Sequence, residues 1–188
     1  MEWIWSNPRS IADFGAEFDY VASSQATSYE IFSDDPVSPT LRPVYRSRSG
    51  VKRFKGLHCP PFSHQPVVDS VWRDIILRFV PAERVQFLPV RLIARGETND
   101  DYMWVIPFDR RICIDAERSN VRRKIEKDGL TMIFAVSGIV HHPDCLAGSH
   151  LARDPQLLSY IVVSDALKNA LCEVGDEGVF RDPRTFVW

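Results

Sequence analysis

The 188-residue sequence lacks the features that mark several broad functional classes. Its formal net charge is only −2, so overall electrostatics gives no reason to expect nucleic acid as a partner. No apolar run approaches the length needed to span a membrane. The first ten residues have no basic start followed by an apolar block, so they do not resemble a secretory signal. We therefore expect a cytoplasmic protein that does not insert into a membrane.

Common enzyme motifs are absent as well. The sequence contains no glycine-rich phosphate loop, no dinucleotide-binding fingerprint, no GxSxG and no HExxH. A serine, a histidine and an aspartate can be chosen from any chain of this size, so their presence alone indicates no catalytic site. The sequence therefore offers no recognisable catalytic or cofactor-binding motif, and no catalytic residue and no bound cofactor are predicted.

Two loops nevertheless contain the histidine and cysteine side chains that zinc prefers. One covers residues 58–64, and the other covers residues 141–150. Neither has a CxxC pair or helical HExxH spacing, and both contain proline, so turn formation is the simpler role. We predict no metal site and keep a small metal-dependent enzyme built on His141, His142 and Cys145 as an alternative. Reduced thiols are expected for the four widely spaced cysteines: Cys59, Cys113, Cys145 and Cys172.

The composition, 45% apolar and 26% charged, is that of a globular protein. Two stretches repeat one order of signals: a short strand, a capping residue, a helix and a second strand. In the first, Val67-Val68 precedes a cap at Asp69-Ser70. In the second, residues 160–163 precede a cap at Ser164, and Gly175 is expected to end the helix in the left-handed conformation. These patterns predict two similar supersecondary units in one fold.

A hairpin is predicted between the two units. Val85–Ala94 and Tyr102–Ile106 alternate like strands, and residues 95–101 join them with turn-forming Gly, Asn and Asp. A short helix capped by Ser119 is predicted next, followed by a strand over residues 130–136. The count is about seven strands and about three helices, which indicates an α+β fold with a mixed, mainly antiparallel sheet.

The N-terminal third differs from the rest of the chain. Residues 1–30 are rich in aromatic side chains, which are expected to cover the core as a flap or arm. Residues 42–55 are basic with interspersed aromatic residues, a pattern that can bind phosphates. The slightly negative total charge favours a solvated loop, so a nucleic-acid-binding module using Arg42–Lys55 is kept as an alternative only. We expect a single domain over residues 1–188, with a Pro- and Arg-rich region at 1–65 and a core at 66–188.

Four stretches carry a resemblance to a known family. They read VVDSVWRDIILRF, VQFLPV, YMWVIPFDRRICIDAERS and SYIVVSDALKNALCEVGDEGVF. Together they resemble immunity protein family eleven of bacterial polymorphic toxin systems over roughly residues 66–188. Residues 163–171 match the V-S-D-x-L-K-x-A-L helix of that family nearly residue for residue. The chain departs from the family where a phenylalanine–arginine pair is usual, because only Arg153 corresponds there.

The resemblance implies a non-enzymatic inhibitor that binds a co-encoded effector toxin and blocks it in the producing cell. The expected partner is therefore a protein, and a homo-oligomer is left open. A toxin that acts on nucleic acid or nucleotides would present a basic cleft. We therefore predict partner-binding residues in the acidic part of the hairpin: Glu97, Asn99, Asp100 and Asp101. An acidic toxin surface would instead favour the basic residues 42–55.

Overall fold

Eleven strands and two α-helices build the fold within the residues that the computed structural model describes, which are 1–6, 16–19, 36–61, 65–125, 131–157, 159–175 and 178–186. The helices are α3 (Ser70–Phe79) and α4 (Asp165–Cys172). The strands are β1 (Glu2–Trp5), β2 (Ala16–Phe18), β3 (Val44–Ser47), β4 (Val67–Val68), β5 (Val85–Ala94), β6 (Glu97–Pro107), β7 (Asn120–Ile125), β8 (Thr131–Ser137), β9 (Leu151–Arg153), β10 (Ile161–Ser164) and β11 (Phe180–Arg181). The predicted α+β class is confirmed, and the two helices are close to the expected number.

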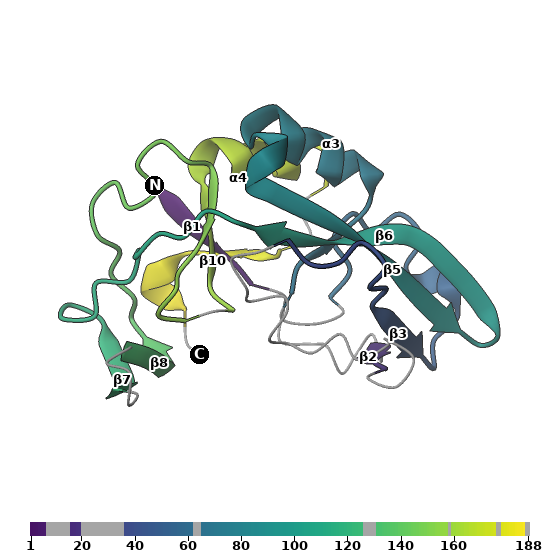
Figure 1. The fold of residues 1–188 in the computed structure, drawn as a ribbon, viewed down its shortest axis with the longest axis horizontal. Helices are drawn as coiled ribbons and strands as arrows, with labels where there is room; N and C mark the ends of the chain where they lie inside the picture. The colour runs from purple at the N-terminus through teal and green to yellow at the C-terminus, as the bar shows by residue number, and fades with distance from the viewer. Residues whose placement is uncertain are drawn as a thin grey trace.

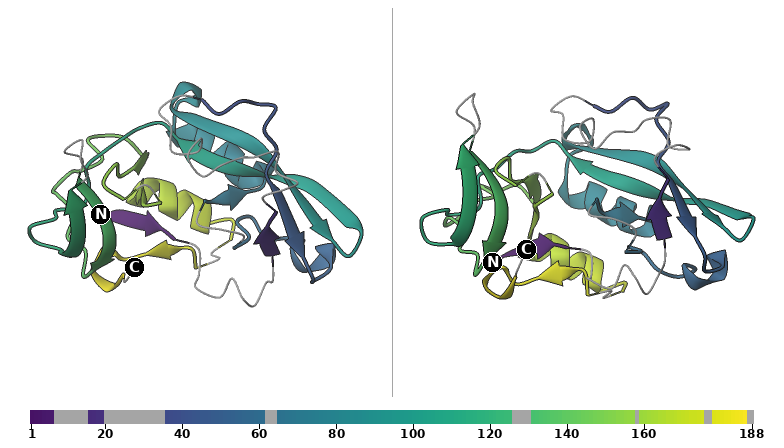
Figure 2. Two further views of the ribbon diagram at one scale, coloured as in Figure 1. Left: turned by 60° about the horizontal axis from the view of Figure 1, so that its bottom comes forward. Right: turned by 90° about the horizontal axis from the view of Figure 1, so that it is seen from below.

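The strands form two sheets and a separate hairpin (Figure 1). The first sheet has the order β11-β1-β10-β9 and is antiparallel throughout. The second has the order β2-β3-β5-β6-β4, in which only the β3–β5 pair is parallel. Strands β7 and β8 pair only with each other, and Figure 2 places them at the opposite end of the molecule from the tip of the β5–β6 hairpin. The predicted mixed, mainly antiparallel pairing is therefore confirmed.

The two strand–cap–helix–strand units are present where the sequence predicts them. The Asp69 carboxylate accepts a hydrogen bond of 3.0 Å from the N–H of Trp72 and caps α3 between β4 and β5. The Ser164 hydroxyl accepts one of 3.2 Å from the N–H of Leu167 and caps α4 between β10 and β11. Each cap satisfies a helix N–H that has no partner within its own helix. The two helices pack side by side along one side of the molecule (Figure 1).

Two local predictions are wrong. The helix predicted at Ser119 is instead strand β7, because β8 offers it a hydrogen-bonding partner, and the Ser119 hydroxyl bonds to the backbone of Val140 instead of capping a helix. Gly175 is not in the left-handed conformation, since it is absent from the residues with positive φ. Its role is close packing, because a Cβ at this position would lie 3.0 Å from Cδ2 of His58.

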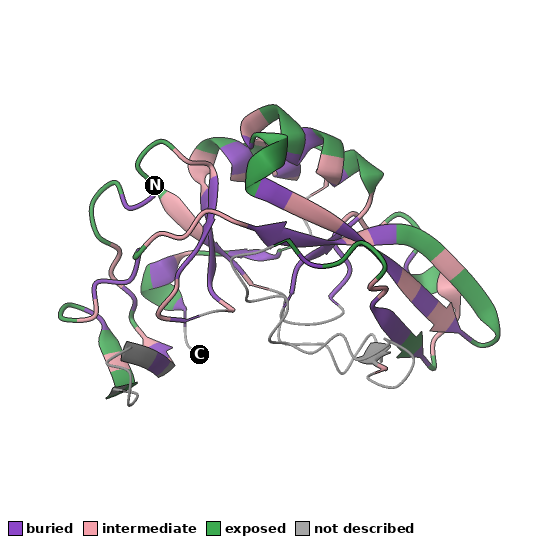
Figure 3. Ribbon diagram, viewed as in Figure 1, coloured by how far each residue is buried: buried purple, intermediate pink, exposed green. Residues whose placement is uncertain are grey.

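Three clusters of buried apolar residues surround the two sheets. Successive residues of a strand point to opposite faces, so Trp5 faces the helices while its neighbour Ile4 faces the β7–β8 side. The third cluster covers the other face of the second sheet and includes Tyr45 and Trp104. Figure 3 shows that the far end of the β5–β6 hairpin projects beyond these clusters and is mainly exposed.

Strand β1 lies inside the first sheet, between β10 and β11. Of the aromatic side chains expected to cover the core, Trp5 is only 2% exposed. The indole N–H of Trp3 donates to Oδ1 of Asp165 at 2.8 Å, and Nζ of Lys168 lies 4.2 Å from the Trp3 ring centroid. Phe14, Tyr20 and Tyr29 lie outside the described residues. In the described part of the chain, no helix has the length and apolar character that a membrane crossing requires.

Candidate functional site

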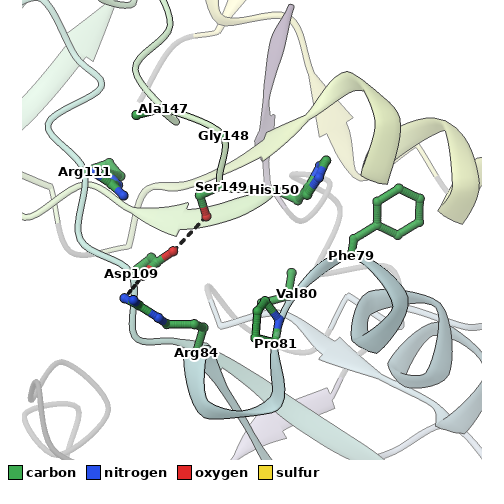
Figure 4. A pocket seen from close by; sticks show the side chains of 10 residues that line it. All are labelled: Phe79, Val80, Pro81, Arg84, Asp109, Arg111, Ala147, Gly148, Ser149 and His150. Atoms are coloured by element: carbon green, nitrogen blue, oxygen red, sulfur yellow. Dashed lines mark hydrogen bonds and ion pairs between the residues drawn. The ribbon is translucent and has the colours of Figure 1, made fainter.

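A cleft of about 270 Å³ opens where the two sheets meet. Four segments form it, the first two of them consecutive in the chain: the end of α3, the turn that follows it, the segment after β6 and the loop before β9 (Figure 4). Its walls are formed by Phe79, Val80, Pro81, Arg84, Asp109, Arg111, Ala147, Gly148, Ser149 and His150. One side of this cleft is therefore apolar, and the other carries charged and polar groups.

Asp109 is the fixed centre of the polar side. Its Oδ1 accepts a hydrogen bond from Nη1 of Arg84 at 2.7 Å, and its Oδ2 accepts one from the Ser149 hydroxyl at 2.8 Å (Figure 4). Its backbone carbonyl accepts a hydrogen bond of 2.9 Å from the N–H of Arg153. The Asp109 side chain is only 12% exposed, whereas that of Arg84 is 58% exposed. The carboxylate is thus held in place, and Arg84 keeps most of its donors in contact with solvent.

Arg111 supplies a second cation to the cleft. Its backbone N–H donates to the carbonyl of Arg153 at 3.0 Å, which fixes the chain at this point. Its guanidinium group has no hydrogen-bonding or ionic partner within the described part of the chain. Two guanidinium groups therefore share the cleft with a single carboxylate, and that carboxylate is occupied by Arg84 and Ser149. The cleft carries an excess of positive charge on a chain whose net charge is −2.

The loop before β9 reaches the cleft through an unusual backbone. Asp144, Ala147 and Gly148 have φ values of 51°, 47° and 82°, in the left-handed region. Alanine rarely adopts this conformation, because its Cβ approaches the backbone carbonyl. Hydrogen bonds of 2.9 Å from the N–H of Ala147 to the Asp144 carbonyl and from the N–H of Ser149 to the Leu146 carbonyl hold the loop. The strained backbone positions Ser149 and His150 at the cleft.

His150 connects the cleft to helix α4. Its Nδ1 lies 2.8 Å from the hydroxyl of Ser164, which is the N-cap of α4. Its ring meets that of Phe79 edge to face, with 5.2 Å between the centroids. These two contacts fix the imidazole plane and leave Nε2 without a partner in the described residues. His150 therefore adds a polar group to the rim of the cleft.

The acidic residues predicted to bind a partner lie at the far end of the molecule. The hairpin turn is only Arg95 and Gly96, with φ values of 51° and 83°, as a two-residue hairpin turn requires. Glu97, Asn99, Asp100 and Asp101 therefore lie within β6 and not in a seven-residue loop. The sequence predicts the hairpin at the correct place but predicts a turn that is longer than the observed one.

Asp100 is bound within the hairpin. The register shifts between Val90, opposite Tyr102, and Leu92, opposite Asn99, so that Arg91 faces two residues in a β-bulge. Arg91 donates to both carboxylate oxygens of Asp100 at 2.9 Å, and Nη2 of Arg42 lies 2.7 Å from Oδ2. The hydrogen bonds from Arg91, with the charge of Arg42, hold the pKa of Asp100 below its ordinary value. The charge of Asp100 is therefore largely neutralised within the chain.

Glu97 and Asp101 are exposed, and neither has a cationic partner in the described part of the chain. Asp101 bonds only to Asn99, whose side-chain amide donates to Oδ2 at 2.9 Å. The net negative charge of this end of the hairpin thus comes from these two carboxylates.

Two of the basic residues in the segment 42–55 are paired with acids of the same chain. Arg42 is paired with Asp100 and Arg46 with Asp19. Lys52 and Lys55 are exposed beside the short turn η1 (Val51–Arg53). The acids that neutralise Arg42 and Arg46 are distant in sequence, so the sequence pattern alone gives no sign of them.

The histidine and cysteine residues considered for a metal site have separate partners. Nε2 of His141 lies 2.9 Å from the hydroxyl of Tyr160, while Nδ1 of His142 lies 3.9 Å from Asp115. Cys145 contacts Cys113, and this contact together with burial raises the pKa of the Cys113 thiol. All four cysteines are free. In the described part of the chain, which excludes His64, no three such residues converge as metal ligands would.

Burial of His141 makes the free energy of unfolding depend on pH. It lowers the pKa of His141 to about 4, which outweighs the opposing charge of Asp182. Because the unfolded chain then binds more protons between pH 6.5 and 4, the free energy of unfolding should fall by about 2 kcal/mol as the pH is lowered through that window. Denaturant unfolding of His141→Gln at several pH values should show a flatter profile than that of the wild type. Identical profiles for wild type and His141→Gln would contradict this assignment.

Comparison with models of known protein families gives a match. A family model described as an immunity protein family (Imm11) matches residues 68–183, which is more than half of the chain. The matched span runs from β4 to the turn after β11 and includes both helices and all four segments of the cleft. No curated protein matches the chain.

Proposed function

Because this chain belongs to the Imm11 immunity protein family, we propose that it binds one cognate effector toxin and blocks its activity in the cytoplasm of the cell that makes both. The family match carries this proposal. Inhibition by binding needs no catalytic residue in the inhibitor. It needs a rigid surface with complementary shape and charge.

Two features support binding over catalysis. The side chains that an enzyme could use, those of His141, His142 and Cys145, are each engaged with a different neighbour. The exposed charged groups, in contrast, lie on rigid elements, at the end of the long β5–β6 hairpin and around the cleft. Charges fixed in this way can steer a protein partner and set its register.

We propose that the hairpin end, defined as Glu97, Asn99, Asp100 and Asp101, contributes to toxin binding. Within it, Glu97 and Asp101 would supply charge to the toxin, whereas Asp100 would hold Arg91 and Arg42 in place. We also propose that residues 1–188 act as one domain, with residues 1–65 joined to the core at 66–188. The place of β1 inside the first sheet supports this second point.

Charge reversal at the hairpin end tests its part in binding. Glu97→Lys and Asp101→Lys are each expected to slow association with the toxin encoded beside this gene by about three- to tenfold at low salt, because steering by exposed charges acts mainly on the association rate. Surface plasmon resonance at two salt concentrations measures this, and the difference should shrink at high salt. Glu173→Lys, an exposed reversal beyond α4, is the matched control. Equal association rates for all three variants would exclude the hairpin end from the interface.

Protection tests the function itself. Co-expression with the toxin should restore growth of a sensitive host, and the purified pair should form a stable complex. A toxin that remains active and unbound in the presence of this protein would refute the proposal.

A further inference from the structure

The cleft before β9 has the composition of a site for a carboxylate. Arg84 and Arg111 bring two guanidinium groups to it, and its one acid, Asp109, already accepts hydrogen bonds at both oxygens. A further cation would therefore find the charge of Asp109 already balanced by Arg84, whereas an anion would find the guanidinium of Arg111, which has no partner in the described part of the chain. A guanidinium binds a planar carboxylate through two parallel hydrogen bonds, which gives strength and orientation.

The apolar side of the cleft narrows the choice of ligand. Phe79, Val80 and Pro81 line it on the side away from Arg111 (Figure 4). A ligand that suits both sides carries a carboxylate at the end of a short aliphatic arm, as the side chain of glutamate does. The volume of about 270 Å³ accommodates a side chain of this size and excludes a folded segment of a partner. Nε2 of His150 and exposed donors of Arg84 remain for further polar contacts.

The cleft is also preorganised. Asp109 is tied to Arg84, Ser149 and the backbone of Arg153, and the loop that carries Ser149 is held in a strained conformation. Strained backbone at a surface site is retained where it positions functional groups. A site that is already formed costs a partner little ordering on binding.

From these observations we propose that the cleft receives an acidic side chain of the bound toxin and anchors it through Arg111 and Arg84. This assignment rests on the toxin-binding role proposed above. It places the anchor about 30 Å from the hairpin end, since β5 runs ten residues at about 3.3 Å each between the two regions. An interface of ordinary size can include both, with the cleft controlling dissociation and the hairpin end controlling association.

Arginine variants of the full chain test the anchor. Arg111→Met is expected to weaken toxin binding about 30-fold or more, mostly through faster dissociation, because it leaves a desolvated carboxylate of the toxin without its partner. Arg84→Met should weaken binding about tenfold, since Nη1 of Arg84 already donates a hydrogen bond to Asp109 and is not available to the toxin. Arg78→Met removes an exposed charge of α3 outside the cleft and should change the affinity less than threefold. Arg111→Lys keeps the charge without the paired donors and should give an intermediate loss, with thermal unfolding checking that each variant is folded.

A double-mutant cycle identifies the occupant. Each Asp and Glu of the toxin is replaced in turn by Ala and measured against wild type and Arg111→Met. For one acidic residue of the toxin, the loss of binding free energy on its replacement should not add to the loss caused by Arg111→Met. For the other acidic residues the two losses should add. If the wild type binds the toxin and Arg111→Met binds it equally tightly, the anchor is overturned and the immunity role is left intact. If Arg111→Met loses affinity but no acidic residue of the toxin is coupled to Arg111, a carboxylate is not the occupant of the cleft. If the wild-type protein does not bind the toxin, both proposals are overturned.

Discussion

Trp72→Ala is expected to lower the free energy of unfolding by about 3–5 kcal/mol. Trp72 is fully buried at the centre of the cluster between the helices and the two sheets. Its ring lies 5.9 Å from that of Trp5 and 6.0 Å from that of Phe180, measured between centroids. Truncation would leave a cavity bordered by β1, β11 and α3, three elements that cannot all move to fill it.

Urea unfolding followed by circular dichroism measures this loss. Val71→Ala, the next residue of the same helix, is the matched control, because its side chain is 43% exposed and should cost less than about 0.5 kcal/mol. Trp72→Phe should cost far less than Trp72→Ala, since the indole N–H of Trp72 has no hydrogen-bond partner among the described residues and its removal leaves no acceptor unsatisfied. A loss for Trp72→Ala near that of Val71→Ala would show that the helices and sheets do not share this cluster.

Asp154→Ala is expected to cost about 3 kcal/mol, for a reason unrelated to packing. The buried carboxylate accepts hydrogen bonds of 2.8 Å from three backbone N–H groups, those of Cys113, Ile114 and Gln156. Each orphaned N–H costs about 1–3 kcal/mol. The substitution also removes the cost of burying the carboxylate, which raises the pKa of Asp154, so the net loss is smaller than the sum of the three.

The same unfolding measurement tests Asp154→Ala, with Asp74→Ala as the control. Asp74 is exposed on α3, and within the described residues its carboxylate bonds only to the neighbouring Arg73, so Asp74→Ala should lower the free energy of unfolding by no more than about 0.5 kcal/mol. Amide hydrogen exchange should quicken at Cys113 and Ile114 in Asp154→Ala and not in Asp74→Ala. Unchanged exchange at these two amides would show that the carboxylate does not hold this loop.

The parts of the fold that the sequence predicts correctly are those whose signals lie close together in the chain. Asp69 and Ser164 each stand directly before a helical apolar stripe, and both prove to be the N-caps. The segment after Ser119 fails because its conformation depends on β8, and no local pattern shows that pairing. Propensity is a weak guide where a partner strand is available.

The cleft could not be predicted at all. Arg84, Asp109, Arg111 and Ser149 come from three separate parts of the chain, and none stands in a recognisable motif. Asp100 is a similar case, since the β-bulge that brings it to Arg91 leaves no mark in the sequence. The one available signal was the family resemblance, which identifies the role without identifying the residues that perform it.

The position of β1 determines when a newly made chain can complete its first sheet. The ribosome makes β1 long before its two partner strands, β10 and β11. Trp3 and Asp165, which share a hydrogen bond, are 162 positions apart. Pairing over such a distance is slow and must wait until the intervening residues have been made, which takes about 8–32 s at about 5–20 residues per second. A nascent chain therefore cannot complete its first sheet until β10 and β11 have been made, and any activity that needs this sheet depends on finished molecules.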